Sequence, residues 1–147
     1  MSEEKYPNLA AFDPRNCISG KVMRCSRIIS KVFRTHLLDF DVTNSQLTIL
    51  FIISKRKEIT QVELGRMLYM EKSTVTRNLN RLFKSKYISK NKRQVYTTEK
   101  GKSFLDKVIP VWENAMAEIR AKLGEEGEEA LNGLVFNLTQ KENALTK

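Results

Sequence analysis

Apolar residues recur at helical spacing along most of the chain, beginning with a stretch near the N-terminus. Asp13-Pro14 combines an N-cap residue with proline at the first helical position, so we expect a helix from there to about Leu38. A single small domain can hardly cover its apolar surface, which indicates packing against another chain. The stripe contains Ile18, Val22, Cys25, Ile29 and Val32, broadened by Met23, Ile28, Phe33 and Leu37.

Two capping boxes predict the beginnings of the next helices. The sequence TNSQ at 43–46 predicts a helix from Ser45 to about Lys55, and TQVE at 60–63 predicts another that ends near Met67–Leu68. After a three-residue turn, the pattern predicts a fourth helix over 72–86. Two helices joined by such a short turn form a helix-turn-helix motif.

The pattern over residues 87–141 predicts a β-hairpin followed by two helices. Residues 87–90 and 93–97 are β-branched and aromatic runs joined at Asn91-Lys92, although lysine is a poor residue for a turn that needs positive φ. Thr98 can cap a long helix, in which Pro110 should cause a bend or a restart and Gly124 a stop. A last helix covers 125–141. The expected fold is therefore mainly α with a small β-hairpin wing, a winged helix-turn-helix with N- and C-terminal dimerisation helices.

Length and composition limit the class of protein. The 147 residues suffice for one domain, and 41% hydrophobic with 29% charged residues is typical of a soluble globular chain. No window approaches the roughly 18 apolar residues of a membrane span, and the acidic N-terminus lacks a secretory apolar region. We expect a cytoplasmic protein with no membrane partner.

The inventory of reactive side chains disfavours an enzyme. Two cysteines and one histidine are too few ligands for a Cys/His metal site. No nucleophile motif accompanies His36, and the six glycines are scattered instead of forming a phosphate loop. We expect neither a catalytic residue nor a cofactor or metal.

The net charge changes this picture because it is local. Residues 72–102 hold ten Lys/Arg and one acid, Glu99, so this segment alone carries the +9 of the whole chain. Such a patch is the electrostatic signature of a surface that meets phosphates. Residues 108–147 carry −3, which argues against their facing nucleic acid.

The fourth helix places its basic and polar residues on one face. A helical wheel groups Val75, Leu79 and Leu82 as the buried side. A short polar N-terminal turn can enter a major groove, where Arg77 could bind a guanine bidentately. The alternative is an ordinary solvated helix face, which the neighbouring motifs disfavour. The outward face comprises Ser73, Arg77, Asn80 and Lys84, flanked by Thr74, Thr76 and Arg81.

The hairpin tip carries a second basic cluster, Lys90, Lys92 and Arg93. We interpret it as a wing that rests on the DNA backbone or in the minor groove. The alternative is an edge strand that lysines protect from aggregation. The position beside the fourth helix favours the wing.

These residues together make the chain resemble the multiple-antibiotic-resistance regulator (MarR) family of winged-helix transcription factors over about residues 15–145. The resemblance is strongest in TNSQ at 43–46, KSTVTRNL at 72–79 and TTEKG at 97–101. It implies a homodimer built by the first, fifth and sixth helices, with Ser73, Thr74, Thr76 and Arg77 contacting half of a near-palindrome. The family's wing is usually longer, with an Asp before an Arg pair, and the shorter Asn91-Lys92-Arg93 here favours backbone contact over minor-groove insertion.

The resemblance also implies a signal, because members respond to small aromatic acids, other metabolites or oxidants. Cys17 is a candidate redox sensor, since it lies near a helix start with Arg15 and Lys21 nearby to lower its pKa. The absence of tyrosines from the first helix favours an inert thiol instead. Cys25 reads as a core residue, and His36 as an exposed helix-end histidine or part of a ligand cavity.

The expected protein is one regulator domain, 1–147, with a DNA-binding winged helix over 43–101 and dimerisation helices over 1–40 and 104–147. Its partners would be double-stranded DNA, a second copy and a small-molecule effector, with repression as its action. Lys55 and Lys57 would add phosphate contacts to those of the wing. Two alternatives are a winged-helix protein-docking module and an RNA binder, the latter disfavoured because the patch lacks exposed aromatics for base stacking.

Overall fold

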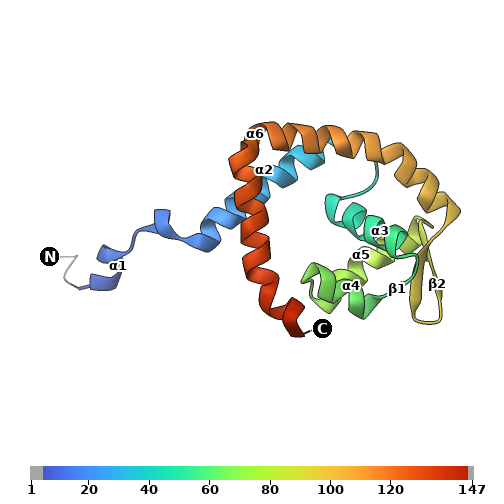
Figure 1. Ribbon diagram of the computed structural model, residues 1–147, viewed down its shortest axis with the longest axis horizontal. Helices are drawn as coiled ribbons and strands as arrows, with labels where there is room; N and C mark the ends of the chain where they lie inside the picture. The colour runs from blue at the N-terminus through green and yellow to red at the C-terminus, as the bar shows by residue number, and fades with distance from the viewer. Residues whose placement is uncertain (1–4, 146–147) are drawn as a thin grey trace. The chain divides into compact units, whose positions relative to one another are not determined.

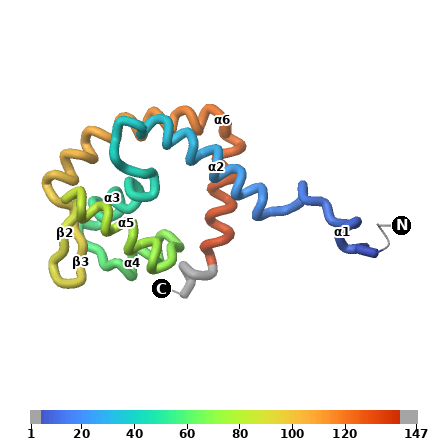
Figure 2. The backbone as a smooth tube through the Cα atoms, turned by 180° about the vertical axis from the view of Figure 1, so that it is seen from behind, coloured from blue at the N-terminus to red at the C-terminus, as the bar shows by residue number. Residues whose placement is uncertain are grey.

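The computed structural model describes the backbone of residues 5–145 and the side chains of residues 5–140. The chain divides into two compact units, Met1–Lys31 and Val32–Lys147. Figures 1 and 2 show both from opposite sides. In the part of the chain that is described, no helix is both long enough and apolar enough to cross a bilayer.

The first unit holds the short helix α1 (Pro7–Ala11), a 3-10 turn η1 (Pro14–Asn16) and most of α2 (Ile18–His36). Asp13 is an N-cap as predicted, but it caps η1, and the long helix begins only at Ile18. The extended backbone of Cys17 (φ −70°, ψ 110°) separates the two. Cys25 is exposed, so its assignment to the core was wrong. Several apolar side chains of α2 are also exposed: Ile18, Val22, Met23 and Ile28.

The second unit contains the end of α2 and a winged helix. Its elements are α3 (Asn44–Arg56), β1 (Ile59–Thr60), α4 (Gln61–Leu68), α5 (Lys72–Lys84), β2 (Ile88–Asn91), β3 (Gln94–Thr97) and α6 (Glu99–Leu145). The three strands form an antiparallel sheet in the order β1-β3-β2. The prediction of a mainly helical fold with a small wing is confirmed, although β1 was not foreseen.

Both capping boxes form as predicted. The Thr43 hydroxyl accepts a hydrogen bond from the Gln46 N–H at 3.2 Å, while the Gln46 side chain accepts one from the Thr43 N–H at 3.1 Å. Thr60 and Glu63 make the same reciprocal pair at 3.2 and 2.8 Å. These bonds satisfy amide groups that a helix start would otherwise leave unpaired, which is why sequence alone located α3 and α4 closely.

The core of the second unit is formed by residues from all its layers. Its largest fully buried side chains come from α3 (Leu47, Ile49, Leu50, Ile53), the sheet (Ile59, Val95), α4 and α5 (Leu64, Val75, Leu79, Leu82) and α6 (Val108). The rings of Phe51 and Trp112 of α6 also form a T-shaped pair, with centroids 5.3 Å apart. The winged helix is thus anchored to α6 through α3 as well as through the sheet.

The junction between α5 and α6 is held by short backbone contacts. Lys86 adopts a left-handed conformation (φ 62°) that ends α5, and the Tyr87 N–H donates to the Leu82 carbonyl at 3.1 Å. Thr98 caps α6 as predicted, because its hydroxyl accepts from the Gly101 N–H at 3.1 Å. The same hydroxyl donates to the Lys86 carbonyl at 2.6 Å. A Cβ on Gly101 would lie only 2.2 Å from the Tyr87 carbonyl oxygen, so this position requires glycine.

The stop predicted at Gly124 is confirmed, because α6 consists of two helical parts that meet at this non-helical residue (φ 69°, ψ 174°). At Pro110, where a bend or a restart was expected, the helix continues without a restart. The positive φ explains the choice of glycine at the break. Beyond it, the apolar residues Leu131, Leu134, Val135 and Leu138 are exposed.

Candidate nucleic-acid interface

α5 presents the two faces that its sequence predicted. Val75, Leu79 and Leu82 are at most 2% exposed and pack into the core of the winged helix. On the other side Ser73, Arg77, Asn80, Arg81 and Lys84 are exposed, while Thr74 and Thr76 are half-buried. The buried side fixes the helix to the scaffold, which leaves the polar side available to a ligand.

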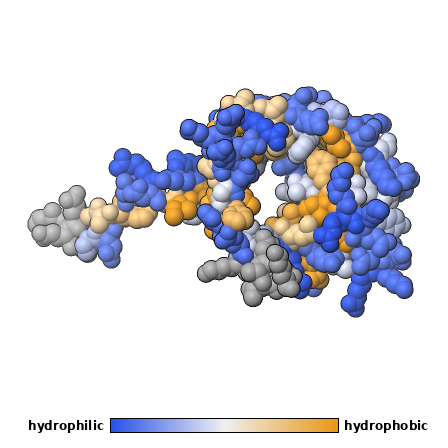
Figure 3. Space-filling model, viewed as in Figure 1, coloured by the Kyte–Doolittle hydropathy of each residue, from blue (hydrophilic) through white to orange (hydrophobic). Residues whose placement is uncertain are grey.

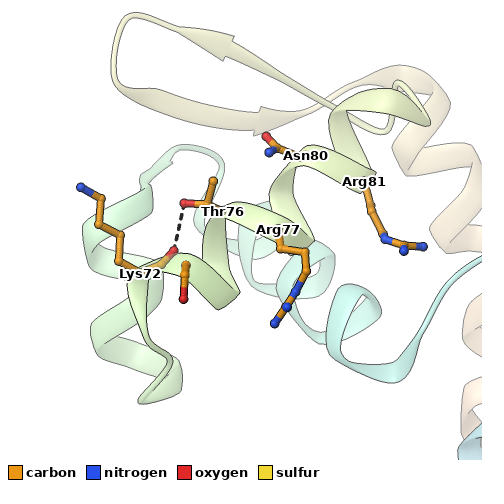
Figure 4. A pocket seen from close by; sticks show the side chains of 6 residues that line it. Lys72, Thr76, Arg77, Asn80 and Arg81 are labelled. Carbon is orange, nitrogen blue, oxygen red and sulfur yellow. Dashed lines mark hydrogen bonds between the residues drawn. The ribbon is translucent and has the colours of Figure 1, made fainter.

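The polar side of α5 lines an open hollow. The residues at its surface are Lys72, Ser73, Thr76, Arg77, Asn80 and Arg81. Figure 4 shows that Arg77 and Arg81 extend to the same side of the helix. Two guanidinium groups on one side of the helix, with short polar side chains on the same helix, suit recognition of guanine edges and phosphates.

Hardly any of the positive charge in this region is neutralised within the chain. Of the ten basic residues in 72–102, Lys102 pairs with Glu99 at 2.9 Å. The other nine make no salt bridge among the residues whose side chains are described. Cations that have only water and counter-ions around them can exchange these for phosphates, with the salt dependence that follows.

The hydroxyl of Thr76 is already engaged within the protein. It donates to the Lys72 carbonyl at 2.9 Å, the bond drawn in Figure 4, and accepts from Gln61 Nε2 at 2.5 Å. Thr76 was predicted to contact DNA, and Gln61 was overlooked because sequence showed it only as the first residue of a helix. The carbonyl of Thr74 accepts from Asn78 Nδ2 at 2.9 Å. Of the four residues that the resemblance placed on the half-site, Ser73 and Arg77 are exposed, whereas Thr74 and Thr76 are half-buried.

The wing is shorter and better supported than a free hairpin. β1 pairs with β3 as far as Thr60↔Gln94, and β2 pairs with β3 as far as Asn91↔Gln94. Only the turn residues Lys92 and Arg93 extend beyond the paired strands, so the turn lies one residue later than predicted. Lys92 adopts φ 56° despite its side chain. Lys90, Lys92 and Arg93 are all exposed.

An aromatic cluster holds the base of the wing. The ring of Tyr87 stacks on Phe104 with centroids 4.3 Å apart, and Phe40 and Phe104 form a T-shaped pair with centroids 6.0 Å apart. Burial, with a smaller effect of Asp41, raises the pKa of Tyr87 above its usual range. The tyrosine therefore stays neutral and packs as an aromatic spacer between the wing and α6.

Cys17 and His36, the two candidate signal residues, both have polar partners. Cys17 Sγ lies 3.2 Å from Ser19 Oγ and accepts from the Gly20 N–H at 3.4 Å, and these hydrogen bonds lower the pKa of its thiol. Arg15, expected to contribute, pairs instead with Asp13 at 3.0 Å. His36 Nε2 lies 2.6 Å from Glu118 Oε2, so the prediction of a histidine exposed at a helix end was wrong.

Comparison with known proteins agrees with this geometry. The MarR family model matches residues 42–94, which cover the helix-turn-helix and most of the wing. No curated protein matches the sequence. BpsR from Bordetella bronchiseptica shares the fold with a TM-score of 0.77 at 16% identity, over 88% of this chain and 98% of that one.

Two further solved structures extend the similarity. Ligand-free NadR aligns with a TM-score of 0.75 at 19% identity, over 89% of this chain and 99% of its own. The reduced form of MarR from E. coli aligns with a TM-score of 0.67 at 20% identity, over 83% and 92%. The MarR family model thus matches the winged helix, and the chain shares the fold of these solved regulators over more than four fifths of its length.

Proposed function

We propose that the protein is a transcriptional regulator that binds a pseudo-palindromic operator in double-stranded DNA as a homodimer and represses the adjacent gene. The observation that carries this proposal is the face of α5. It presents Ser73, Arg77, Asn80 and Arg81 together, without internal ion pairs among the described residues, beside a wing with three exposed cations. A helix of this kind in a helix-turn-helix enters the major groove.

The exposed polar and basic residues of this surface divide into two roles. Arg77 and Asn80, with the shorter Ser73, can reach base edges and so supply sequence choice, because arginine pairs with guanine and asparagine with adenine. The exposed lysines and Arg93 supply phosphate contacts, which give affinity without sequence preference. They lie at the end of α3 (Lys55, Lys57), on α5 (Lys84) and on the wing (Lys90, Lys92, Arg93).

Exposed apolar surface supports the homodimer. α2 exposes Ile18, Val22, Met23 and Ile28, and Figure 3 shows hydrophobic residues at the surface along its first turns. The last part of α6 exposes Leu131, Leu134 and Leu138 at helical spacing. A second copy of the chain would remove these faces from water. A twofold pair would then read two half-sites about one helical turn of DNA apart.

We infer that a small molecule controls the DNA binding. BpsR is a protein whose DNA binding is regulated by 6-hydroxynicotinic acid, and NadR forms a complex with 4-hydroxyphenylacetate. Both ligands are small aromatic acids, and ligands of that class are the first to screen here. A redox input would act at Cys17, whose thiol has a pKa lowered by its hydrogen bonds to Ser19 and Gly20, and a change in DNA binding after thiol alkylation would test for it.

A gel shift against the DNA upstream of the protein's own gene tests the proposal. The regulator should retard this duplex more strongly than a scrambled one, with affinity that falls steeply as salt rises. A docking module would instead show no preference between the two duplexes at any salt concentration. Footprinting of the retarded complex would then locate two symmetric half-sites.

A further inference from the structure

The helices α4 and α5 pack against each other through an apolar and a polar contact. On the apolar side, a Cβ on Gly65 of α4 would lie 3.7 Å from Val75 Cγ2 of α5, and Val75 is 1% exposed. The polar contact is the 2.5 Å hydrogen bond from Gln61 Nε2 to Thr76 Oγ1. Among the described residues, no other side-chain hydrogen bond joins these two helices.

The direction of the polar contact follows from the chemistry of Thr76. A threonine hydroxyl has one hydrogen, and Thr76 donates it to the Lys72 carbonyl at 2.9 Å. The oxygen must therefore accept the bond from Gln61, which only the amide nitrogen of glutamine can donate. The bond thus defines both the rotamer of Thr76 and the orientation of the Gln61 amide.

Such a bond adds a directional restraint to the packing that holds α5. Buried apolar side chains fix the helix in the core, whereas the hydrogen bond depends on the distance and angle between two particular atoms and so restrains small rotations of α5 about its own axis. A side chain about 6 Å from a helix axis moves about 1 Å for every 10° of rotation. A bidentate bond from Arg77 to guanine tolerates only a few tenths of an ångström in donor–acceptor distance.

We propose that Gln61 is a positioning residue for DNA recognition, an inference that rests on the function proposed above. Through the hydroxyl of Thr76, it sets the rotation of α5 so that Arg77 and Asn80 meet base edges in register. Gln61 acts from outside the recognition face, and Thr76 contributes its hydroxyl to the scaffold. Loss of the bond leaves the phosphate contacts in place, because these tolerate a shifted helix.

Four variants and a control test this role. Gln61→Ala and Thr76→Val each remove the bond from one side, Thr76→Ser keeps the hydroxyl, and the double variant carries both Gln61→Ala and Thr76→Val. Gln140→Ala makes the same amide deletion at an exposed position on α6. The probes are a duplex that the wild-type protein enriches from a randomised library and a scrambled duplex of equal composition. Fluorescence anisotropy gives both dissociation constants, and thermal melting reports the fold.

Gln61→Ala and Thr76→Val should each lower the ratio of enriched to scrambled affinity by about five- to tenfold, the loss expected of one hydrogen bond. Binding to the scrambled duplex and the melting temperature should stay near the wild-type values. Thr76→Ser and Gln140→Ala should keep the full ratio. The double variant should be no worse than either single variant, because the two substitutions remove the same bond.

A wild-type ratio in Gln61→Ala, or fully additive losses in the double variant, would overturn the proposal. Equal losses in Thr76→Ser and Thr76→Val would do the same, even if Gln61→Ala were unstable. A wild-type protein that enriches no duplex would instead refute DNA binding itself, so the two failures are distinguishable.

Discussion

Replacing Gly101 with alanine should destabilise the junction between the wing and α6. The new Cβ would lie 2.2 Å from the Tyr87 carbonyl oxygen and 2.8 Å from Thr97 Cγ2, so the backbone must separate by about 1 Å to reach ordinary contact. That movement stretches the bond from the Thr98 N–H to Tyr87 (3.0 Å) and the one from the Thr98 hydroxyl to Lys86 (2.6 Å). Overpacking and weakened hydrogen bonds together predict a loss of about 2–4 kcal/mol.

A matched glycine elsewhere on the same helix provides the control. Gly133 lies in the regular part of α6, and a Cβ there would have no atom of the described residues within 4 Å. Gly133→Ala should raise the free energy of unfolding by roughly 0.5–1 kcal/mol, because alanine favours the helix. Urea unfolding at equal protein concentration measures both, and Gly101→Ala should also melt roughly 6–12 °C lower. If Gly101→Ala were as stable as the wild type, the close approach of Tyr87 to α6 would be wrong.

Three further predictions concern the wing and Cys17. Thr97 Oγ1 is buried and has no hydrogen-bond partner among the described residues, so Thr97→Val should stabilise the protein by about 1 kcal/mol in urea unfolding; a loss of stability would mean that the hydroxyl has a partner. Arg93→Lys should keep DNA affinity, whereas Arg93→Ala should weaken operator and random duplexes about equally and lower the salt slope by about one. A wing arginine inserted in the minor groove would instead make Arg93→Lys fail. Because hydrogen bonds lower the pKa of Cys17, its alkylation in a Cys25→Ser background should reach full rate at lower pH than that of a free thiol; an ordinary profile would refute those bonds.

Local signals explain how much of the fold the sequence could predict. The two capping boxes placed the starts of α3 and α4 within a residue, since the caps depend only on residues three positions apart. The faces of α5 followed from its helical period in the same way. The start of α2 was misplaced because Asp13-Pro14 begins a 3-10 turn as readily as an α-helix.

Contacts between distant residues could not be predicted from local patterns. β1 has only two residues, too few to show alternation, and exists because it pairs with β3 some 35 positions later. The pairs Gln61–Thr76 and His36–Glu118 join separate helices. Polar side chains on helices usually face water, so no sequence pattern distinguishes these two partnerships from ordinary solvated side chains.

Arg77→Ala offers the most direct test that the exposed face of α5 reads DNA sequence. We would measure dissociation constants of wild type and variant for the enriched and scrambled duplexes at several salt concentrations. Arg77→Ala should lower the ratio of affinity for the enriched duplex to affinity for the scrambled duplex by roughly tenfold or more, which is the cost of losing one bidentate guanine contact. An unchanged ratio, with both duplexes bound as before, would contradict it.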